Sequence, residues 1–324
     1  MSLLTIIQDA YTELGLGDSA PTTVIGNTDP QVAQLLALSN SEGQEFCKLQ
    51  GPWGGWPELN RVETFNLLPV GPYTGNTTLN SDLITGLSST SGIQVGYGVA
   101  GANIYQSATI IAVPPTTAAG TVQMSAVASG TATNQSFNFG QILYPLPTDL
   151  RSIINATYWD RNFRWPMLGP LSPVEWQVIV SGISPVGPRI RFRVLGNPPM
   201  MEIQPLPGTG QTDQIAYEYV SASWCSDASG NPRSISGGIC RWVADTDLYL
   251  WSEDTMRYGI KWRFLRAKGL DYTQELEVWK NARDFQLSVS GASRSLRMNA
   301  TRNGLHFLNY NNCPDTGFGY GSGP

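Results

Sequence analysis

The sequence predicts an α+β protein: a bundle of four main helices, two N-terminal and two C-terminal, a β-rich middle region and an inserted small β-sandwich. Three observations predict this class. Apolar residues recur at helical spacing near both ends of the 324-residue chain. Between these ends, apolar and polar residues alternate in short runs bounded by Gly, Pro, Ser and Thr, as they do in strands. Asp82 is the single charged residue between Asn66 and Gly140, and this change in composition marks a separate module.

Two helices are expected near the N-terminus. Apolar residues of the first follow steps of four, three and four, and they are Leu3, Ile7, Ala10 and Leu14. The second helix begins at Asp29-Pro30, because the carboxylate can cap free N–H groups and proline suits the first helical position. It ends at Gly51-Pro52, and its core-facing residues are Val32, Leu35, Ser39 and Phe46.

Residues 67–135 are predicted to form the inserted β domain. The flanking stretches "RVETFN" and "FGQILYPLP" look like two pieces of one interrupted β region, so the core comprises residues 1–66 and 136–288. Later in that region "RIRFRVL" and "MMEIQPLP" form a hairpin across "GNPP", and "QIAYEYVSASW" adds a strand.

Two further helices are expected between Asp245 and residue 288. Asp245 or Asp247 caps the first, which ends at Gly269, where a left-handed glycine is expected. Its seam has heptad-like spacing suited to bundle packing and consists of Leu248, Trp251, Thr255, Tyr258, Trp262 and Leu265. Asp271 starts the second helix, with Gln274 three residues later in a capping-box pattern. Residues 289–324, rich in Gly, Asn and Ser, are expected to be a flexible tail.

Composition excludes several function classes. The net charge of −5 argues against a dedicated DNA binder. No signal peptide or membrane span is visible, so the protein is expected to be made in a cytoplasm. "GYGVAG" at 96–101 lacks the following helix and acidic residue of a dinucleotide site. Zinc spacing is absent among the four cysteines and the single histidine, which are Cys47, Cys225, Cys240, Cys313 and His306. The sequence therefore predicts no enzyme, no cofactor and no metal.

Basic residues supply the candidate interface positions. Arg189, Arg191 and Arg193 lie on one face of a predicted strand and could clamp carboxylates or phosphates. The alternative is ordinary pairing with Glu202 and Glu218 on neighbouring strands. A second set lies in the last turns of a helix, where cations offset the helix dipole, and it consists of Lys261, Arg263, Arg266 and Lys268. The tail adds Arg294, Arg297, Arg302, His306, Phe307 and Tyr310.

Three ordered segments carry a resemblance to a known family. "TIIQDAYTELGLG", "YWDRNFRWPMLGPLSPVEWQ" and "KWRFLRAKGLDYTQE" resemble the head-to-tail adaptors of short-tailed bacteriophages, which are head-completion proteins that bind the portal. The resemblance covers residues 1–65 and about 137–288. The insert is similar to the small Ig-like modules of phage virion proteins.

The resemblance implies a structural virion protein, assembled in the host cytoplasm and located at the head–tail interface. Such a protein forms a homo-oligomeric, dodecameric ring, joins the portal protein to the tail nozzle protein, and completes the channel through which genomic DNA passes without specific binding. The tail would dock on the portal, and the Ig-like insert could contact fibre or capsid proteins. The alternative is a carbohydrate-binding or adhesion module of a phage tail that uses the β insert.

Overall fold

A computed structural model gives the structure of residues 2–17, 19–49, 56–181, 189–233 and 239–290. These residues form five α-helices, one short 3-10 helix (Pro57–Leu59) and several antiparallel sheets. The predicted mixed α+β class therefore agrees with the structure. The helices are α1 (Leu3–Glu13), α2 (Pro30–Phe46), α3 (Pro173–Val180), α4 (Glu253–Lys268) and α5 (Thr273–Val289).

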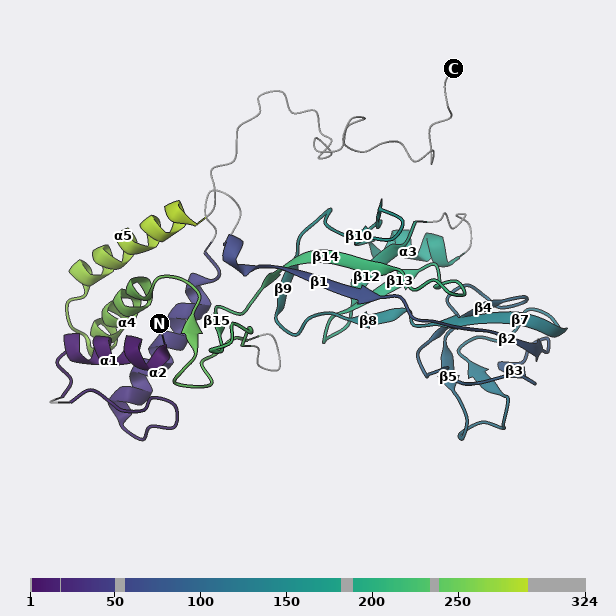
Figure 1. Cartoon of the computed structure of the whole chain (residues 1–324), viewed down its shortest axis with the longest axis horizontal. Coiled ribbons are helices and arrows are strands. Elements are labelled where there is room, and N and C mark those ends of the chain that lie inside the picture. The colour runs from purple at the N-terminus through teal and green to yellow at the C-terminus, as the bar shows by residue number, and fades with distance from the viewer. Residues whose placement is uncertain (1, 18, 50–55, 182–188, 234–238, 291–324) are drawn as a thin grey trace, which may run out of the picture. The chain divides into compact units, whose positions relative to one another are not determined.

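The four-helix bundle predicted as the core is wrong. Helix α4 contacts α1, α2 and α5 (Figure 1), but much of the interior beside it is filled by aromatic rings from segments outside the helices. These rings belong to Trp56, Trp224, Trp242, Tyr249 and Trp251. Helix α5 has no buried residue and packs chiefly on α4. Because each large ring buries about 150–250 Å², these residues help to fill the first core without a fourth buried helix.

The predicted heptad seam also changes. Helix α4 begins at Glu253, so Leu248 and Trp251 precede it, and Leu248 lies in β16 (Leu248–Tyr249) opposite β15 (Cys225–Ser226). Thr255 and Trp262 of the predicted seam are buried, and the helix also buries Met256, Ile260 and Phe264, which follow steps of four residues. Steps of four keep these side chains on one face, and that face enters the first core.

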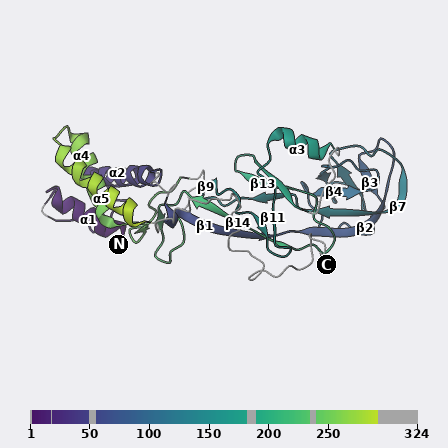
Figure 2. The ribbon, with the colours of Figure 1, turned by 90° about the horizontal axis from the view of Figure 1, so that it is seen from above.

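The middle of the chain forms two antiparallel sheets around a second core. The larger contains β1 (Asn60–Asn66), β14 (Gln214–Ser221), β10 (Trp159–Asp160) and β11 (Trp165–Pro166) in that order, with β9 (Leu150–Ile153) also paired to β14. The smaller contains β12 (Arg191–Leu195), β13 (Met200–Gln204) and β8 (Leu143–Pro145). Strands β12 and β13 pair antiparallel across residues 196–199, so the predicted hairpin is confirmed. Helix α3 lies close to this hairpin in Figures 1 and 2.

The insert, predicted as a small β-sandwich, is instead one six-stranded antiparallel sheet folded over on itself. Its order is β4 (Gly98–Gly101), β7 (Ala132–Gly140), β2 (Pro69–Thr77), β3 (Leu83–Thr85), β6 (Val122–Met124) and β5 (Ile110–Ala112). The two edges meet, because the Ile110 N–H donates to the Tyr97 carbonyl oxygen at 2.8 Å. The Gly96 N–H donates in turn to the Ile110 carbonyl oxygen, also at 2.8 Å. A third core fills this closed sheet, and closure leaves little free strand edge.

The ends of the insert lie side by side. Pro69 of β2 pairs with Gly140 of β7, and the Gln141 N–H donates to the Leu68 carbonyl oxygen at 3.0 Å. The sheet thus spans residues 69–140, whereas the sequence placed the insert at 67–135. A chain that enters and leaves a module at neighbouring points has the geometry of an insertion.

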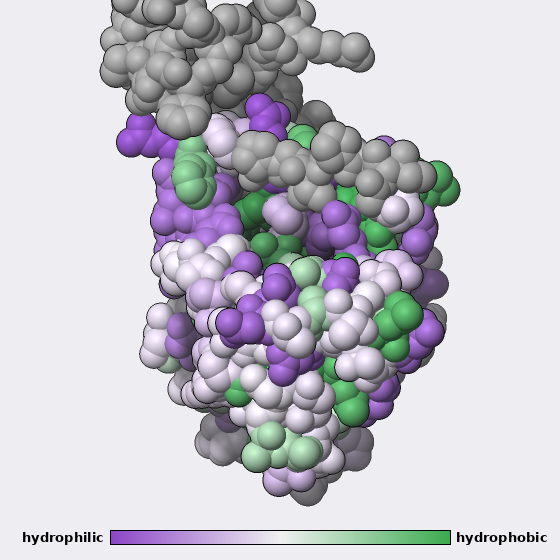
Figure 3. Space-filling view, turned by 90° about the vertical axis from the view of Figure 1, so that its right-hand side faces the viewer, coloured by the Kyte–Doolittle hydropathy of each residue, from purple (hydrophilic) through white to green (hydrophobic). Residues whose placement is uncertain are grey.

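One surface of the molecule is shown in Figure 3, from the side where Figure 1 draws β2, β3 and β7. The surface is mainly pale, and hydrophilic and apolar residues form separate spots on it. Exposed apolar side chains of the insert include Val95, Tyr105 and Ile111. Since Asp82 is the single charged residue between Asn66 and Gly140, the insert is polar mainly through neutral side chains.

Among the described residues, no helix has the length and apolar character needed to cross a membrane.

The end of α4 supports a first test. Gly269 has φ 72° and ψ 20°, so the expected left-handed glycine is confirmed, and its N–H donates to the Arg266 carbonyl oxygen at 3.1 Å. Gly269→Val is expected to lower the free energy of unfolding by about 1–2 kcal/mol, because β-branched residues oppose this conformation. The matched control is Ala267→Val on the exposed side of α4, with an expected loss of about 0.6 kcal/mol. Equal losses in urea titrations would contradict this account of the turn.

Candidate assembly surface

Two of the four predicted basic residues of α4 bind inside the fold. Lys261 Nζ lies 2.9 Å from Glu13 Oε2 on α1 and 3.3 Å from Glu275 Oε2 on α5. Arg257, one turn earlier, also reaches Glu13 at 3.3 Å. These ion pairs connect α4 to the helices on either side. Lys261 is therefore a structural residue and not a free interface cation.

Arg263 is the second basic residue of α4 that binds inside the fold. Its Nε lies 2.6 Å from Glu42 Oε2 and its Nη2 lies 2.7 Å from Glu45 Oε2, both on α2. The guanidinium also lies over the Trp262 ring, 4.6 Å from its centroid. With both carboxylates and an aromatic face engaged, Arg263 joins α4 to α2 and has little capacity left for a partner.

Glu42 is the buried centre of this network. The side chain is fully buried, and its Oε1 accepts a hydrogen bond from Trp279 Nε1 of α5 at 2.7 Å. Burial raises the pKa of Glu42, and the charge and hydrogen bond of Arg263 oppose that rise. Gly259 leaves the necessary space, because a Cβ there would lie 2.3 Å from Glu42 Cδ. Glu42 thus connects α2, α4 and α5 through one carboxylate.

Arg266 and Lys268 are exposed at the end of α4, as the sequence predicted. Neither forms an ion pair with any residue that the structure describes. Lys268 Nζ lies 5.1 Å from the centroid of the Phe264 ring. Leu270, in the turn to α5, is also exposed. This corner therefore offers two cations and one apolar side chain to a partner.

Helix α5 carries an apolar outer face, defined here as Val278, Phe285 and Val289. Phe285 is 69% exposed and Val289 61%. The three residues are separated by seven and four positions, so they lie along one side of the helix. This row of apolar side chains leaves apolar surface in contact with water and is a candidate contact surface for a partner.

The inner side of α5 is held firmly. Trp279 and Leu287 pack against the first core, and Trp279 bonds to Glu42. At the C-terminal end Ser290 Oγ donates to Glu58 Oε1 at 2.6 Å. The outer face of α5 is consequently presented on a helix that is fixed at several points, although none of its own residues is buried.

Of the two possibilities left open for the arginines near β12, the clamp is not formed. Arg193 Nε lies 2.5 Å from Glu202 Oε2 on β13, and its guanidinium lies 4.6 Å from the Trp176 ring centroid. The alternative of cross-strand pairing with Glu202 is therefore confirmed for Arg193. Arg191 is half-buried in the strand, and Arg189 precedes the strand and is exposed. The strand does not gather all three guanidiniums into one free site.

The remaining predicted interface positions lie outside the described residues. They are Arg294, Arg297, Arg302, His306, Phe307 and Tyr310.

Sequence reasoning missed the two most informative features of this region. In the sequence, Val278 and Phe285 have the heptad spacing that indicates the outer face of α5. The predicted interface positions were instead the basic residues of α4. Glu42 falls between Ser39 and Phe46 on the buried side of α2. An acid at a core-facing position is a signal, because a buried carboxylate requires a cation or several donors.

A groove of about 390 Å³ lies between the insert and the smaller middle sheet. The exposed Tyr105 and the side chains of Gln106 and Gln204 line it, together with the ring of Trp176. Glu202 is also at its wall but is paired with Arg193. The groove combines aromatic surface with amide groups.

The described part of the chain contains no group of three or more His, Cys, Asp or Glu side chains placed to hold a metal ion. No protein-family model matches the sequence, and no curated protein matches it significantly.

Proposed function

We propose that the protein is a structural virion adaptor, forming a ring that joins the portal at the phage head to the tail nozzle and completes the DNA channel. Its partners are then the portal protein, the nozzle protein and further copies of itself. The sequence resemblance supplies the function class, and the outer face of α5 supplies the surface through which the portal is bound.

One observation carries the proposal: a 17-residue helix without buried residues displays Val278, Phe285 and Val289 outward. A helix in this state satisfies its backbone hydrogen bonds internally but leaves apolar area in water. Burying a fully exposed large apolar side chain gains about 1.5–3 kcal/mol, and each of these three, being partly covered already, gains a fraction of that amount. Contact with a large partner is therefore favourable along the part of α5 from Val278 to Val289.

We take the portal to be the partner that covers the outer face of α5, because of the position of α5 in the chain. The outer face ends at Val289, and the chain continues directly into residues 291–324, the segment predicted from the sequence to dock on the portal. A helix face and a following segment that bind the same partner form one continuous contact. Arg266, Lys268 and Leu270 at the other end of α5 extend the available surface.

Rigidity also favours this use of α5. Lys261 connects α4 to α5 through Glu275, and Glu42 connects α2 to α5 through Trp279. A contact surface that is already fixed loses little conformational entropy on binding. The ion pairs and hydrogen bonds of Lys261 and Glu42 thus fix the outer face of α5 before a partner binds.

Sedimentation velocity with the purified portal ring from the same genome tests the proposal. We expect the protein to sediment as a monomer by itself and to co-sediment with the portal as a complex of defined stoichiometry. Independent sedimentation of the two proteins at all concentrations would contradict the proposal.

A second candidate function rests on the groove beside β4. The exposed ring of Tyr105, on which a sugar could stack, and the amides of Gln106 and Gln204 together resemble the composition of carbohydrate sites. A glycan array of host surface polysaccharides distinguishes the two candidates. Specific glycan binding that Tyr105→Ala abolishes would favour the adhesion module, whereas the adaptor predicts none.

A further inference from the structure

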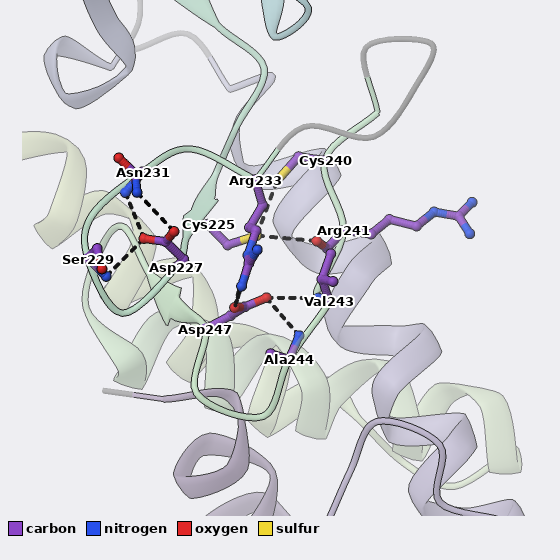
Figure 4. Close-up of polar contacts among 10 residues, drawn as sticks. All are labelled: Cys225, Asp227, Ser229, Asn231, Arg233, Cys240, Arg241, Val243, Ala244 and Asp247. Carbon is purple, nitrogen blue, oxygen red and sulfur yellow. Dashed lines mark hydrogen bonds and ion pairs between the residues drawn. The ribbon is translucent and has the colours of Figure 1, made fainter.

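Two buried cysteines face each other beside the first core. Cys225 lies in β15, and Cys240 lies 15 residues later in the segment that leads towards β16. Their sulfur atoms are 3.2 Å apart (Figure 4), and their side chains are 1% and 3% exposed. A disulfide has an S–S distance of about 2.05 Å, so closing the gap requires a shift of only about 1 Å.

Polar contacts hold the two backbone segments in register. The Arg233 N–H donates to the Cys225 carbonyl oxygen at 3.1 Å, and the Arg233 guanidinium donates to Asp247 Oδ1 at 2.8 and 3.0 Å. Asp247 Oδ2 in turn accepts from the N–H groups of Val243 and Ala244. Figure 4 shows these bonds around the thiols. The thiols are therefore brought together by a framework that does not itself depend on a sulfur–sulfur bond.

We propose that Cys225 and Cys240 form an internal disulfide when the protein meets a small-molecule disulfide oxidant such as oxidised glutathione. The inference stands on this geometry alone and does not depend on the proposed function. The third described cysteine, Cys47, is also buried, but its thiol donates to the Gln44 carbonyl oxygen at 3.2 Å. Cys47 is consequently a natural control within the same core.

The reaction balances as two thiol–disulfide exchanges. The Cys240 thiolate attacks one sulfur of oxidised glutathione, whose S–S bond breaks and whose other half leaves as a thiolate that takes up a proton. Cys225 then loses its proton and attacks Cys240 Sγ, which forms the protein disulfide and releases the second glutathione. The two protein thiols together lose two electrons, and one glutathione disulfide gains them and is reduced to two thiols.

Cys240 is the expected first nucleophile. Its neighbour Ile239 is 46% exposed, so the backbone beside this thiol reaches the surface. The hydrogen bond with the Cys225 thiol lowers the pKa of Cys240 and raises that of Cys225. The thiol that ionises more easily and lies next to an exposed residue reacts first.

Peptide mapping of the full-length protein tests the proposal. The protein is incubated with oxidised glutathione, remaining thiols are blocked with a maleimide, and a non-reduced digest is analysed by mass spectrometry. We expect a cross-linked peptide containing Cys225 and Cys240, and an intact mass about 2 Da lower before blocking. The melting temperature should rise by several degrees, because the bond closes a loop of the unfolded chain.

Serine variants distinguish the Cys225–Cys240 disulfide from unspecific oxidation of the cysteines. Cys47→Ser should form the same cross-link, whereas Cys225→Ser and Cys240→Ser should not, with helical circular dichroism checking that each variant folds. A stable glutathione adduct on wild-type Cys240, or cross-links to Cys47 or Cys313 in its place, would overturn the proposal. The wild-type map decides the question even if a serine variant fails to fold.

Discussion

Gly43→Ala is expected to destabilise the helical part of the protein by about 1–3 kcal/mol. A Cβ at Gly43 would lie 2.4–2.6 Å from three ring atoms of Trp224. Trp224 is fully buried and packs edge-on against Trp242, with ring centroids 4.9 Å apart, so a shift of its ring away from α2 is opposed by the surrounding core. Overpacking of a well-filled core costs about 1–3 kcal/mol and sometimes more.

The expected change in the free energy of unfolding has the opposite sign to the change that helix propensity alone would give. In an unconstrained helix the same substitution stabilises by about 1 kcal/mol, because alanine is the better helix former. Ser41→Ala, two residues earlier on the exposed side of α2, is the matched control and should change the free energy of unfolding by less than about 0.5 kcal/mol. Urea unfolding followed by circular dichroism measures both. A Gly43→Ala protein as stable as wild type would show that the Trp224 ring is not fixed against α2.

Glu42→Ala is expected to cost about 3–5 kcal/mol, as removal of one partner from a buried ion pair does. Arg263, whose side chain is 11% exposed, would lose its buried carboxylate partner, and Trp279 Nε1 would lose its acceptor. Since Trp279 belongs to α5, the loss should be accompanied by loosening of that helix. Hydrogen exchange should therefore show faster exchange of α5 amides than of α1 amides in the variant.

Glu45→Ala is the matched control for this prediction. Glu45 lies on the same helix and pairs with the same arginine, but its side chain is 64% exposed. The hydrogen bond from Arg263 lowers the pKa of Glu45, yet solvent screening limits such a pair to below about 1 kcal/mol. Losses of similar size for the two glutamates would mean that Arg263 is satisfied equally well by either carboxylate, and the central role of Glu42 would be wrong.

Local chemistry made some helix boundaries predictable from the sequence. Asp29 caps α2 by accepting from the Gln31 N–H at 2.8 Å, and Pro30 is the first helical residue. Gly269 ends α4 in the left-handed conformation. At both positions the deciding groups are within a few residues of each other, so distant parts of the chain do not alter the outcome.

Other boundaries depended on contacts that the sequence does not reveal. Asp245 was an expected helix cap, but its carboxylate accepts from the N–H groups of Val24 and Ile25, more than 200 positions away. Asp247, the other expected cap, pairs with Arg233. The predicted cap is therefore wrong at both positions, because each carboxylate binds groups in loops and Ser252 is the N-cap residue of α4. Helix α4 therefore begins at Glu253, later than expected.

The candidate surface was predictable only in part for the same reason. Arg266 and Lys268 are exposed as expected. Lys261 forms ion pairs with acidic residues on α1 and α5, and Arg263 forms ion pairs with acidic residues on α2. Sequence spacing shows which side of a helix a cation occupies, but not which acid lies opposite it after folding. The bundle prediction failed similarly, because Trp224 and Trp251 fill the first core from outside the helices.

Electron microscopy of portal rings tests the central claim, that the outer face of α5 binds the portal. Wild-type protein is compared with Phe285→Glu, which removes the most exposed apolar side chain of that face, and with Val95→Glu, whose valine is 61% exposed on the insert. We expect wild type and Val95→Glu to decorate the portal with a complete ring, and Phe285→Glu to leave it bare while retaining its helical circular dichroism. Complete rings formed by Phe285→Glu would contradict the assignment of this surface, and bare portals with wild-type protein would contradict the adaptor function itself.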